Sequence, residues 1–216
     1  MTDEQVMAII ENEFKEKTLG VTKQYLEIHS PIYADNKIKI DRIDRESKDE
    51  IIAYLPVLKE SFYFSVYIDA KTNKVIGVDT EAYHRIYFRA TSKSLTADEL
   101  KGMIILPPTE IWNKGDFRKS GKSNYTFSNF TILPNPEPDQ FKDKLRKLLD
   151  HLEEDKDGIK QLVNNANGHI QVAMDIHNGN GMIGGPSIDS IDIKRMNELG
   201  LSIDFDLYVS GNKFKE

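Results

Sequence analysis

The sequence feature that most constrains the fold is a change of hydrophobic period along the second half of the chain. Apolar residues recur at helical spacing from Asp139 to Glu153, and a shorter helical pattern follows at about 156–164. Capped helical patterns also occur at 96–103 and 189–199, whereas period-two alternation predicts strands at 83–91, 124–132, 170–177 and 201–209. The predicted order is therefore β-α-β, a helical pair and β-α-β.

This order of elements predicts an α+β fold for residues 83–216. It favours a ferredoxin-like sandwich, in which helices cover one face of a single sheet, over a doubly wound parallel sheet. At 216 residues the chain is long enough for one large core or two modest ones. We expect residues 1–82 to form a small separate module before this domain.

The module at residues 1–82 is predicted to combine a helix with a small antiparallel sheet. Thr2 and Gln5 form a capping box at the start of a helix that should stop near Gly20. Extended segments are predicted at 25–33, 37–43, 62–69 and 74–78, with a turn at Asp35-Asn36 between the first two. Asn73 suits a left-handed position in the last turn. The hairpin around it resembles the closing hairpin of the small modules called PepSY.

The charge distribution points to a protein partner rather than to nucleic acid. The net charge is −6, and residues 1–82 hold 16 acidic against 11 basic side chains, whereas residues 83–216 hold 19 against 18. An acidic surface repels phosphate groups, so we expect no nucleic-acid binding and favour a partner protein that is more basic.

The chain contains no cysteine, which excludes disulfides, thiol nucleophiles and thiolate zinc sites. No stretch approaches the roughly 18 continuous apolar residues of a membrane-spanning helix. The first residues, Met1 to Glu4, are acidic, whereas a secretory signal begins with basic residues. These features predict a cytoplasmic protein with no membrane partner.

Three segments of the second half form a recognisable set. They are the run 106–116, with the pattern Pro-Thr-x-x-Trp-x-Lys-Gly-Asp, the leucine-rich helix at 145–152, and the acidic alternating strand at 198–209. Together they resemble the bacterial domain of unknown function 4279 family over about residues 84–210. The resemblance implies a fold but no activity, cofactor or site residue. Tyr125 stands where such domains usually show a second tryptophan.

A basic loop beside the only tryptophan is the first candidate binding site. Its members are Trp112, Lys114, Asp116 and Arg118. An aromatic ring beside cations can bind an anionic or aromatic ligand, although a lone tryptophan in a small domain is often a packing residue. The Gly-x5-Gly-Lys-Ser spacing that ends at Ser123 is one residue too long for a phosphate-binding loop, and a strand follows it.

The second candidate site is an acidic sheet face that carries an imidazole. Its members are Asp175, His177, Asp204 and Asp206. A carboxylate-oriented imidazole can act as a general base, so this face would suit hydrolysis, but a solvated sheet face shows the same alternation. The five histidines are too scattered along the chain for a metal site, and no cofactor is predicted.

Two functions are left open by these patterns. The first is a non-catalytic protein-binding protein, such as an intracellular immunity or partner-sequestering protein, that engages a basic protein through the acidic module or the sheet face. The glycine-rich loop at 178–186, with Met182 and Ile183 at its tip, suits an adaptable contact surface. The alternative is a hydrolase or small-ligand-binding domain that uses the Trp112 loop and the face of Asp175 and His177.

Overall fold

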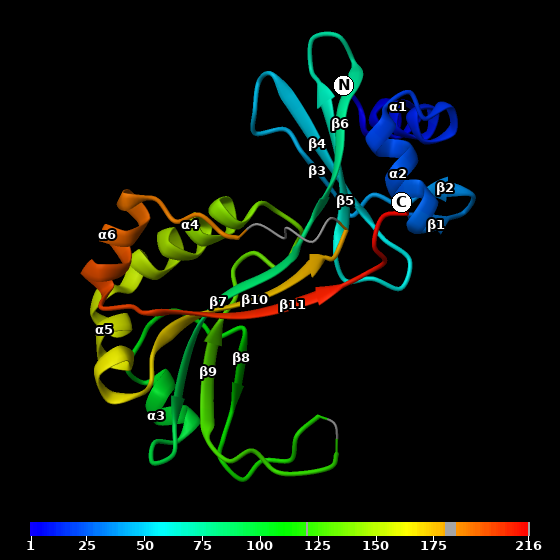
Figure 1. Cartoon of the computed structure of the whole chain (residues 1–216). Coiled ribbons are helices and arrows are strands. Elements are labelled where there is room, and N and C mark those ends of the chain that lie inside the picture. The colour runs from blue at the N-terminus through cyan, green and yellow to red at the C-terminus, as the bar shows by residue number, and fades with distance from the viewer. Residues whose placement is uncertain (120, 180–184, 216) are drawn as a thin grey trace.

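The computed structural model consists of two units, each with its own β-sheet and hydrophobic core (Figure 1). It describes residues 1–119, 121–179 and 185–215, so Met182 and Ile183 of the glycine-rich loop lie outside the described residues. The protein is a mixed α+β structure. None of the helices in the described part of the chain is long and apolar enough to cross a membrane.

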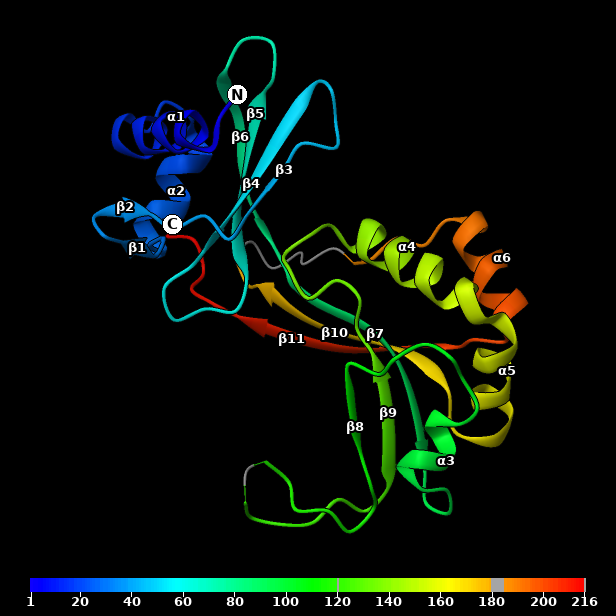
Figure 2. The ribbon, with the colours of Figure 1, turned by 180° about the vertical axis from the view of Figure 1, so that it is seen from behind.

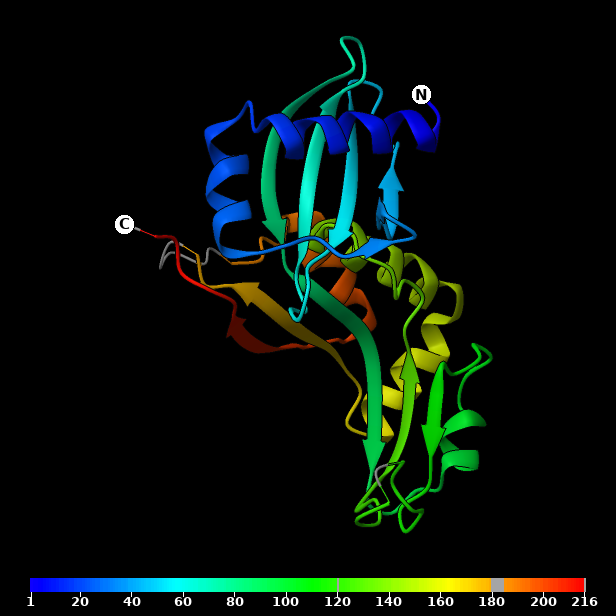
Figure 3. The ribbon, with the colours of Figure 1, turned by 90° about the vertical axis from the view of Figure 1, so that its right-hand side faces the viewer.

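The first unit is a four-stranded antiparallel sheet with a long helix lying across it (Figure 3). Its elements are α1 (Asp3–Glu16), α2 (Gly20–Ile28), β1 (Tyr33–Ala34), β2 (Lys37–Ile38), β3 (Arg42–Asp44), β4 (Glu50–Pro56), β5 (Tyr63–Asp69) and β6 (Lys74–Glu81). The strand order is β3-β4-β5-β6, and β1 and β2 form a separate hairpin. The predicted capping box is confirmed, because the Thr2 hydroxyl accepts from Gln5 N and the Gln5 side chain accepts from Thr2 N.

The predicted extended segment at 25–33 is largely wrong, because its first residues belong to α2. Thr22 and Tyr25 lie buried on one face of this helix, three residues apart. β4 was missed, because its last four residues are all buried and therefore show no alternation. The predicted left-handed turn residue Asn73 is confirmed, with φ at 56°.

The second unit is a five-stranded mixed sheet with helices. Its elements are β7 (Tyr83–Ser92), α3 (Ala97–Lys101), β8 (Glu110–Trp112), β9 (Ser128–Ile132), α4 (Phe141–Leu152), the 3₁₀ turn η1 (Glu153–Asp155), α5 (Lys156–Asn165), β10 (His169–His177), α6 (Ser190–Leu199) and β11 (Ile203–Ser210). The strand order is β11-β10-β7-β9-β8, and only the β10–β11 pair is parallel. The predicted helices are found, and the four predicted strands correspond to β7, β9, β10 and β11, although β9 begins only at Ser128. β8 is an additional edge strand that alternation did not reveal.

The helices α4, α5 and α6 lie together on one side of this sheet (Figure 2). The leucines of α4 are fully buried in the core against apolar residues of β7 and β10, such as Phe88 and Val172. Side chains alternate across a strand, so the other face carries the polar residues of β7, β10 and β11. Arg85 and Asp206 are examples of this open face.

The two units are joined by a nearly continuous strand, because Ala82 alone separates β6 from β7. The chain then returns to the first unit near its end (Figure 1). There Phe214 packs against the first core. Residues next to Ala82 therefore lie where the two units meet, and so do residues at the end of β10.

Candidate functional site

Trp112 lies at the end of β8 and stacks on Tyr125, with ring centroids 4.3 Å apart and an interplanar angle of 17°. The guanidinium carbon of Arg118 lies 5.4 Å from the Tyr125 ring centroid. The Trp112 indole nitrogen is buried and has no hydrogen-bond partner among the described residues. Tyr125 thus supplies the partner ring for Trp112.

The other two residues of this loop, Asp116 and Lys114, form hydrogen bonds within the protein. Asp116 accepts a hydrogen bond from Asn113 N at 2.7 Å, and Lys114 Nζ donates to Lys93 O at 3.2 Å. A shallow depression of about 370 Å³ lies beside Trp112, and its lining residues include Asp116 but neither Lys114 nor Arg118. Of the four loop residues, Trp112 and Asp116 therefore line the same depression.

The acidic sheet face is not one cluster. The parallel register places Asp204 opposite Gln171 and Asp206 opposite Ala173, whereas His177 is opposite Ser210. His177 is four residues beyond Ala173 along β10, which separates it from Asp206 by about 13 Å. Asp175 pairs in register with Tyr208. Within the described residues, no group of three or more His, Asp or Glu side chains is arranged to hold a metal ion.

His177 instead belongs to the contact between the two units. Its Nε2 lies 3.0 Å from Nε2 of His29 and 3.0 Å from the carbonyl oxygen of Asn212. The rings of Tyr25 and Phe214 lie 5.8 Å from the His177 ring. Burial lowers the pKa of both histidines, so neutral rings are favoured in this contact.

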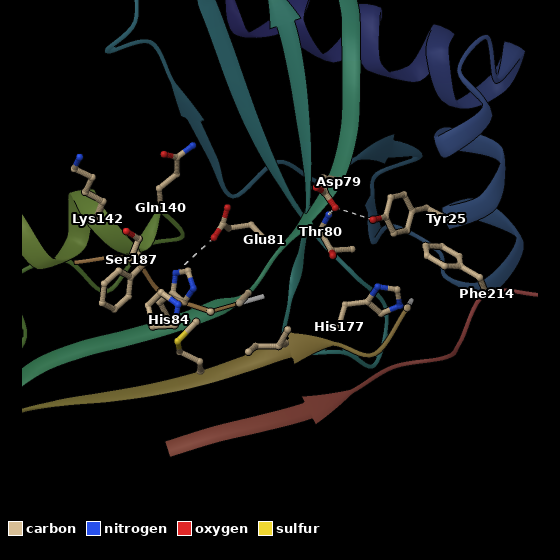
Figure 4. A pocket seen from close by; sticks show the side chains of 17 residues that line it. Tyr25, Asp79, Thr80, Glu81, His84, Gln140, Lys142, His177, Ser187 and Phe214 are labelled. Carbon is tan, nitrogen blue, oxygen red and sulfur yellow. Dashed lines mark hydrogen bonds and ion pairs between the residues drawn. The ribbon is translucent and has the colours of Figure 1, made fainter. Parts of the chain in front are cut away.

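A cavity of about 540 Å³ lies beside this contact, between the two units (Figure 4). Its polar lining includes Asp79, Glu81, His84, Gln140, Lys142 and His177, and its aromatic lining consists of Tyr25, Phe141 and Phe214. These residues come from α2, β6, β7, α4 with its preceding loop, β10 and the chain end. Of the candidate site residues named from the sequence, His177 lines this cavity, and so do Gly179, Gly185 and Pro186 of the glycine-rich loop.

Glu81 is the ionisable group with the most unusual surroundings in the cavity. Its side chain is 19% exposed, and its carboxylate oxygen lies 3.7 Å from His84 Nδ1 (Figure 4). Burial, together with the nearby charges of Asp79 and Asp139, raises the pKa of Glu81 to about 8. Burial also lowers the pKa of His84 to about 4. At neutral pH this pair is therefore a mostly protonated acid beside a neutral imidazole.

A second charged cluster lies behind the cavity and ties the first unit to α4. The buried carboxylate of Asp139 pairs with Arg42 at 2.6 Å and with Lys147 at 2.9 Å. Lys144 is also buried, and burial lowers its pKa to about 8. Its Nζ donates to Glu137 O at 2.7 Å. These pairs hold the two units together from the side opposite His177.

Glu81 and His84 were missed because no local pattern marks them. The predicted strand ends at residue 78 and the next begins at 83, so Asp79 and Glu81 fall in a predicted connection, where polar residues are ordinary. The one available signal was position, since the run 79–84 crosses the predicted boundary between residues 82 and 83. Ligand sites often lie where two units meet.

Among known protein families, Domain of unknown function (DUF4279) matches residues 81–210, which confirms the resemblance of the three segments described above. No curated protein and no solved structure shows a significant match to the chain. The matched residues include the whole second sheet and the Glu81–His84 side of the cavity. Because the match covers more than half of the chain, this protein belongs to the DUF4279 family, a family of unknown function.

Proposed function

We propose that this protein is a non-catalytic binding protein that captures an extended segment of a more basic partner protein along β11. An immunity or partner-sequestering protein would act by holding its partner protein in this way. One observation carries the proposal: β11 is an edge strand of the second sheet, and the apolar side chains Phe205, Leu207 and Val209 on it are exposed. An exposed apolar edge strand is a template for pairing with another chain.

The free backbone groups of β11 follow from its pairing with β10. Ser202 O accepts a hydrogen bond from Ile170 N at 2.9 Å, and Ser210 O accepts one from Asn178 N at 2.8 Å. Backbone groups of alternate residues point to the same side of a strand. The N–H and C=O groups of residues 203, 205, 207 and 209 therefore point away from β10, toward the open edge.

The side chains of β11 indicate which segment would pair with it. Phe205, Leu207 and Val209 lie on the helix side and are 38%, 50% and 48% exposed. Asp204 and Asp206 are exposed on the open face. Residues on adjacent strands lie side by side, so the best partner alternates apolar residues with lysine or arginine. The net charge of −6 adds long-range attraction to such a segment.

We also infer that β11 is an addition to a ferredoxin-like sandwich. β7, α3, β8, β9, the α4–α5 pair and β10 follow one another as β-α-β-β-α-β. Their strands lie in the order β10-β7-β9-β8, each antiparallel to its neighbour. The parallel β11 and its preceding helix α6 extend this arrangement at one edge, which is where the proposed partner pairs.

A library of random peptides about as long as β11, screened against the purified protein, tests the proposal. We expect enriched peptides that alternate apolar residues with lysine or arginine. Their binding, measured by calorimetry, should weaken as the salt concentration rises, because exposed charges are screened.

Two substitutions at one position separate backbone pairing from side-chain contact. Leu207→Pro removes an outward N–H, which an edge strand tolerates, whereas Leu207→Thr removes apolar surface and keeps the N–H. Loss of binding in the first variant with only modest weakening in the second supports strand addition. Equal binding by both folded variants contradicts it. If the wild-type protein forms dimers and Leu207→Pro abolishes them, β11 pairs with a second copy of this chain instead of with a partner protein.

A further inference from the structure

We propose that the cavity between the two units binds a small organic cation with an alkylguanidinium or alkylammonium group. The cavity is separate from the exposed edge of β11, so this proposal stands without the protein-binding function. Its volume of about 540 Å³ lies within the range of small-molecule sites. The chemistry of its walls decides which ligand class fits.

The cavity contains two carboxyl groups, Asp79 and Glu81, of which Asp79 accepts a hydrogen bond from the Tyr25 hydroxyl at 2.7 Å. Asp79 and Glu81 both line it from β6 (Figure 4). His84 Nδ1 lies 3.3 Å from the carbonyl oxygen of Asp139, which only accepts, so the neutral ring carries its proton on Nδ1 and Nε2 is an acceptor. Lys142 is the lysine among the lining residues, and its charge is paired with Asp189 at 3.1 Å. A ligand rich in N–H donors matches these walls.

The aromatic lining also suits a cation. Tyr25 and Phe214 lie with ring centroids 5.2 Å apart at one end, and Phe141 lies near His84 at the other, with ring centroids 6.0 Å apart. Ring faces attract guanidinium and ammonium groups, and ring edges pack against an alkyl stem.

Glu81 supplies the strongest electrostatic reason for a cation. Among the described residues no hydrogen bond reaches its carboxylate, and its one ion-pair contact is His84 at 3.7 Å. A cation beside Glu81 and Asp79 would offset both the burial of one carboxylate and the repulsion between the two. The charged or titratable groups around Glu81 are Tyr25, Tyr54, Tyr67, Asp79, His84, Asp139, Lys142, Lys144 and His177.

Calorimetric titration of the full-length protein tests the proposal with a matched set of probes. Butylguanidinium is the cation, butylurea is its neutral analogue of similar shape, and butyrate is the anion. A guanidinium stays charged over the whole accessible pH range, so any pH dependence belongs to the protein. We expect butylguanidinium to bind at least about tenfold more tightly than butylurea, and butyrate not to bind.

Proton release provides a second measurement that needs no variant. The Glu81 carboxyl is mostly protonated at pH 7, because its pKa is about 8, and cation binding favours the ionised form. Titrations at pH 7 in buffers of different ionisation enthalpy should therefore show release of up to about one proton. Affinity should rise by up to about tenfold per pH unit from pH 6 to 8 and then level off.

Glu81→Gln keeps the shape of the side chain but removes its charge. It should weaken butylguanidinium binding at least about tenfold and abolish proton release, whereas Glu4→Gln, at an exposed position of α1, should change neither. Three outcomes would overturn the proposal. They are equal affinity for butylguanidinium and butylurea, tighter binding of butyrate than of butylguanidinium, and no binding of any probe. If Glu81→Gln does not fold, absence of proton release in the wild type overturns it.

Acetyl-arginine-amide distinguishes two sources of the same chemical group. If it binds more tightly than butylguanidinium, the site takes an arginine side chain of a protein. If it binds more weakly, the site takes a free small cation.

Discussion

Glu81 shows how burial turns a single acid into a pH-dependent element of stability. Its pKa is raised to about 8 by burial and by the charges of Asp79 and Asp139. The folded protein therefore holds a proton that the unfolded chain releases above its ordinary pKa of 4.5. Because the folded pKa is the higher one, the contribution to stability is complete below pH 4.5 and is lost as the pH rises through about 8.

We predict that Glu81→Gln removes this pH dependence, because glutamine does not ionise. The variant should be more stable than the wild type at pH 9, by on the order of 5 kcal/mol, and nearly equal to it at pH 4. Thermal unfolding followed by circular dichroism across this range measures the difference. Glu4→Gln should show no such trend, and a constant difference at all pH values would contradict the prediction.

At the scale of elements, the connection between α1 and α2 depends on one buried carboxylate. Glu13 accepts hydrogen bonds from Leu19 N at 3.1 Å and from the Thr22 hydroxyl at 2.6 Å, and its second oxygen accepts from Thr18. Burial by itself would raise the pKa of Glu13, but these hydrogen bonds to the ionised form lower it. This side chain thereby positions the helix that carries Tyr25 to the cavity.

Glu13→Gln should destabilise the protein by about 1–3 kcal/mol at pH 7, because an amide nitrogen cannot accept the hydrogen bonds that the carboxylate oxygen accepts. The folded pKa of Glu13 is the lower one, so this contribution is present above pH 4.5 and is lost as the pH falls further. Urea unfolding at pH 7 and at pH 3 should show a smaller difference in acid. Glu16→Gln, on the exposed part of α1, serves as the control.

At the scale of the whole molecule, the two units are held together on two sides of the cavity. One side has the His29–His177 contact with the ring of Phe214, and the other has the Asp139–Arg42 pair. Phe214 thus packs against the core of the first unit, although it follows the last strand of the second unit. The shape of the cavity therefore depends on both units being docked.

Phe214→Ala should loosen this docking without unfolding either core. We expect a loss of about 1–3 kcal/mol, since the ring is only half-buried, and faster hydrogen exchange at the end of β10 and in α2. Phe117→Ala removes the same ring from a site where it is 74% exposed, and should leave both quantities unchanged. Equal effects of the two substitutions would show that the chain end does not join the units.

Much of the fold follows from short-range patterns. Capping at Thr2 and Thr96, the turn at Asn73 and the leucine helix α4 each depend on residues within a few positions of one another, and each is found where the sequence predicts it. α2 was misjudged because Glu13 and the packing of Tyr25, rather than local alternation, favour its helical form.

The amino-acid sequence by itself determined the α+β class, most helices and strands of the second unit and its family. Only the tertiary structure decided which side chains share a site. The register of β10 and β11 separates His177 from Asp206, whereas docking of the two units places His177 on the same cavity as Glu81. Helix caps and turns are set by neighbouring residues. Strand register and docking depend instead on packing between residues far apart in the chain, which no local pattern encodes.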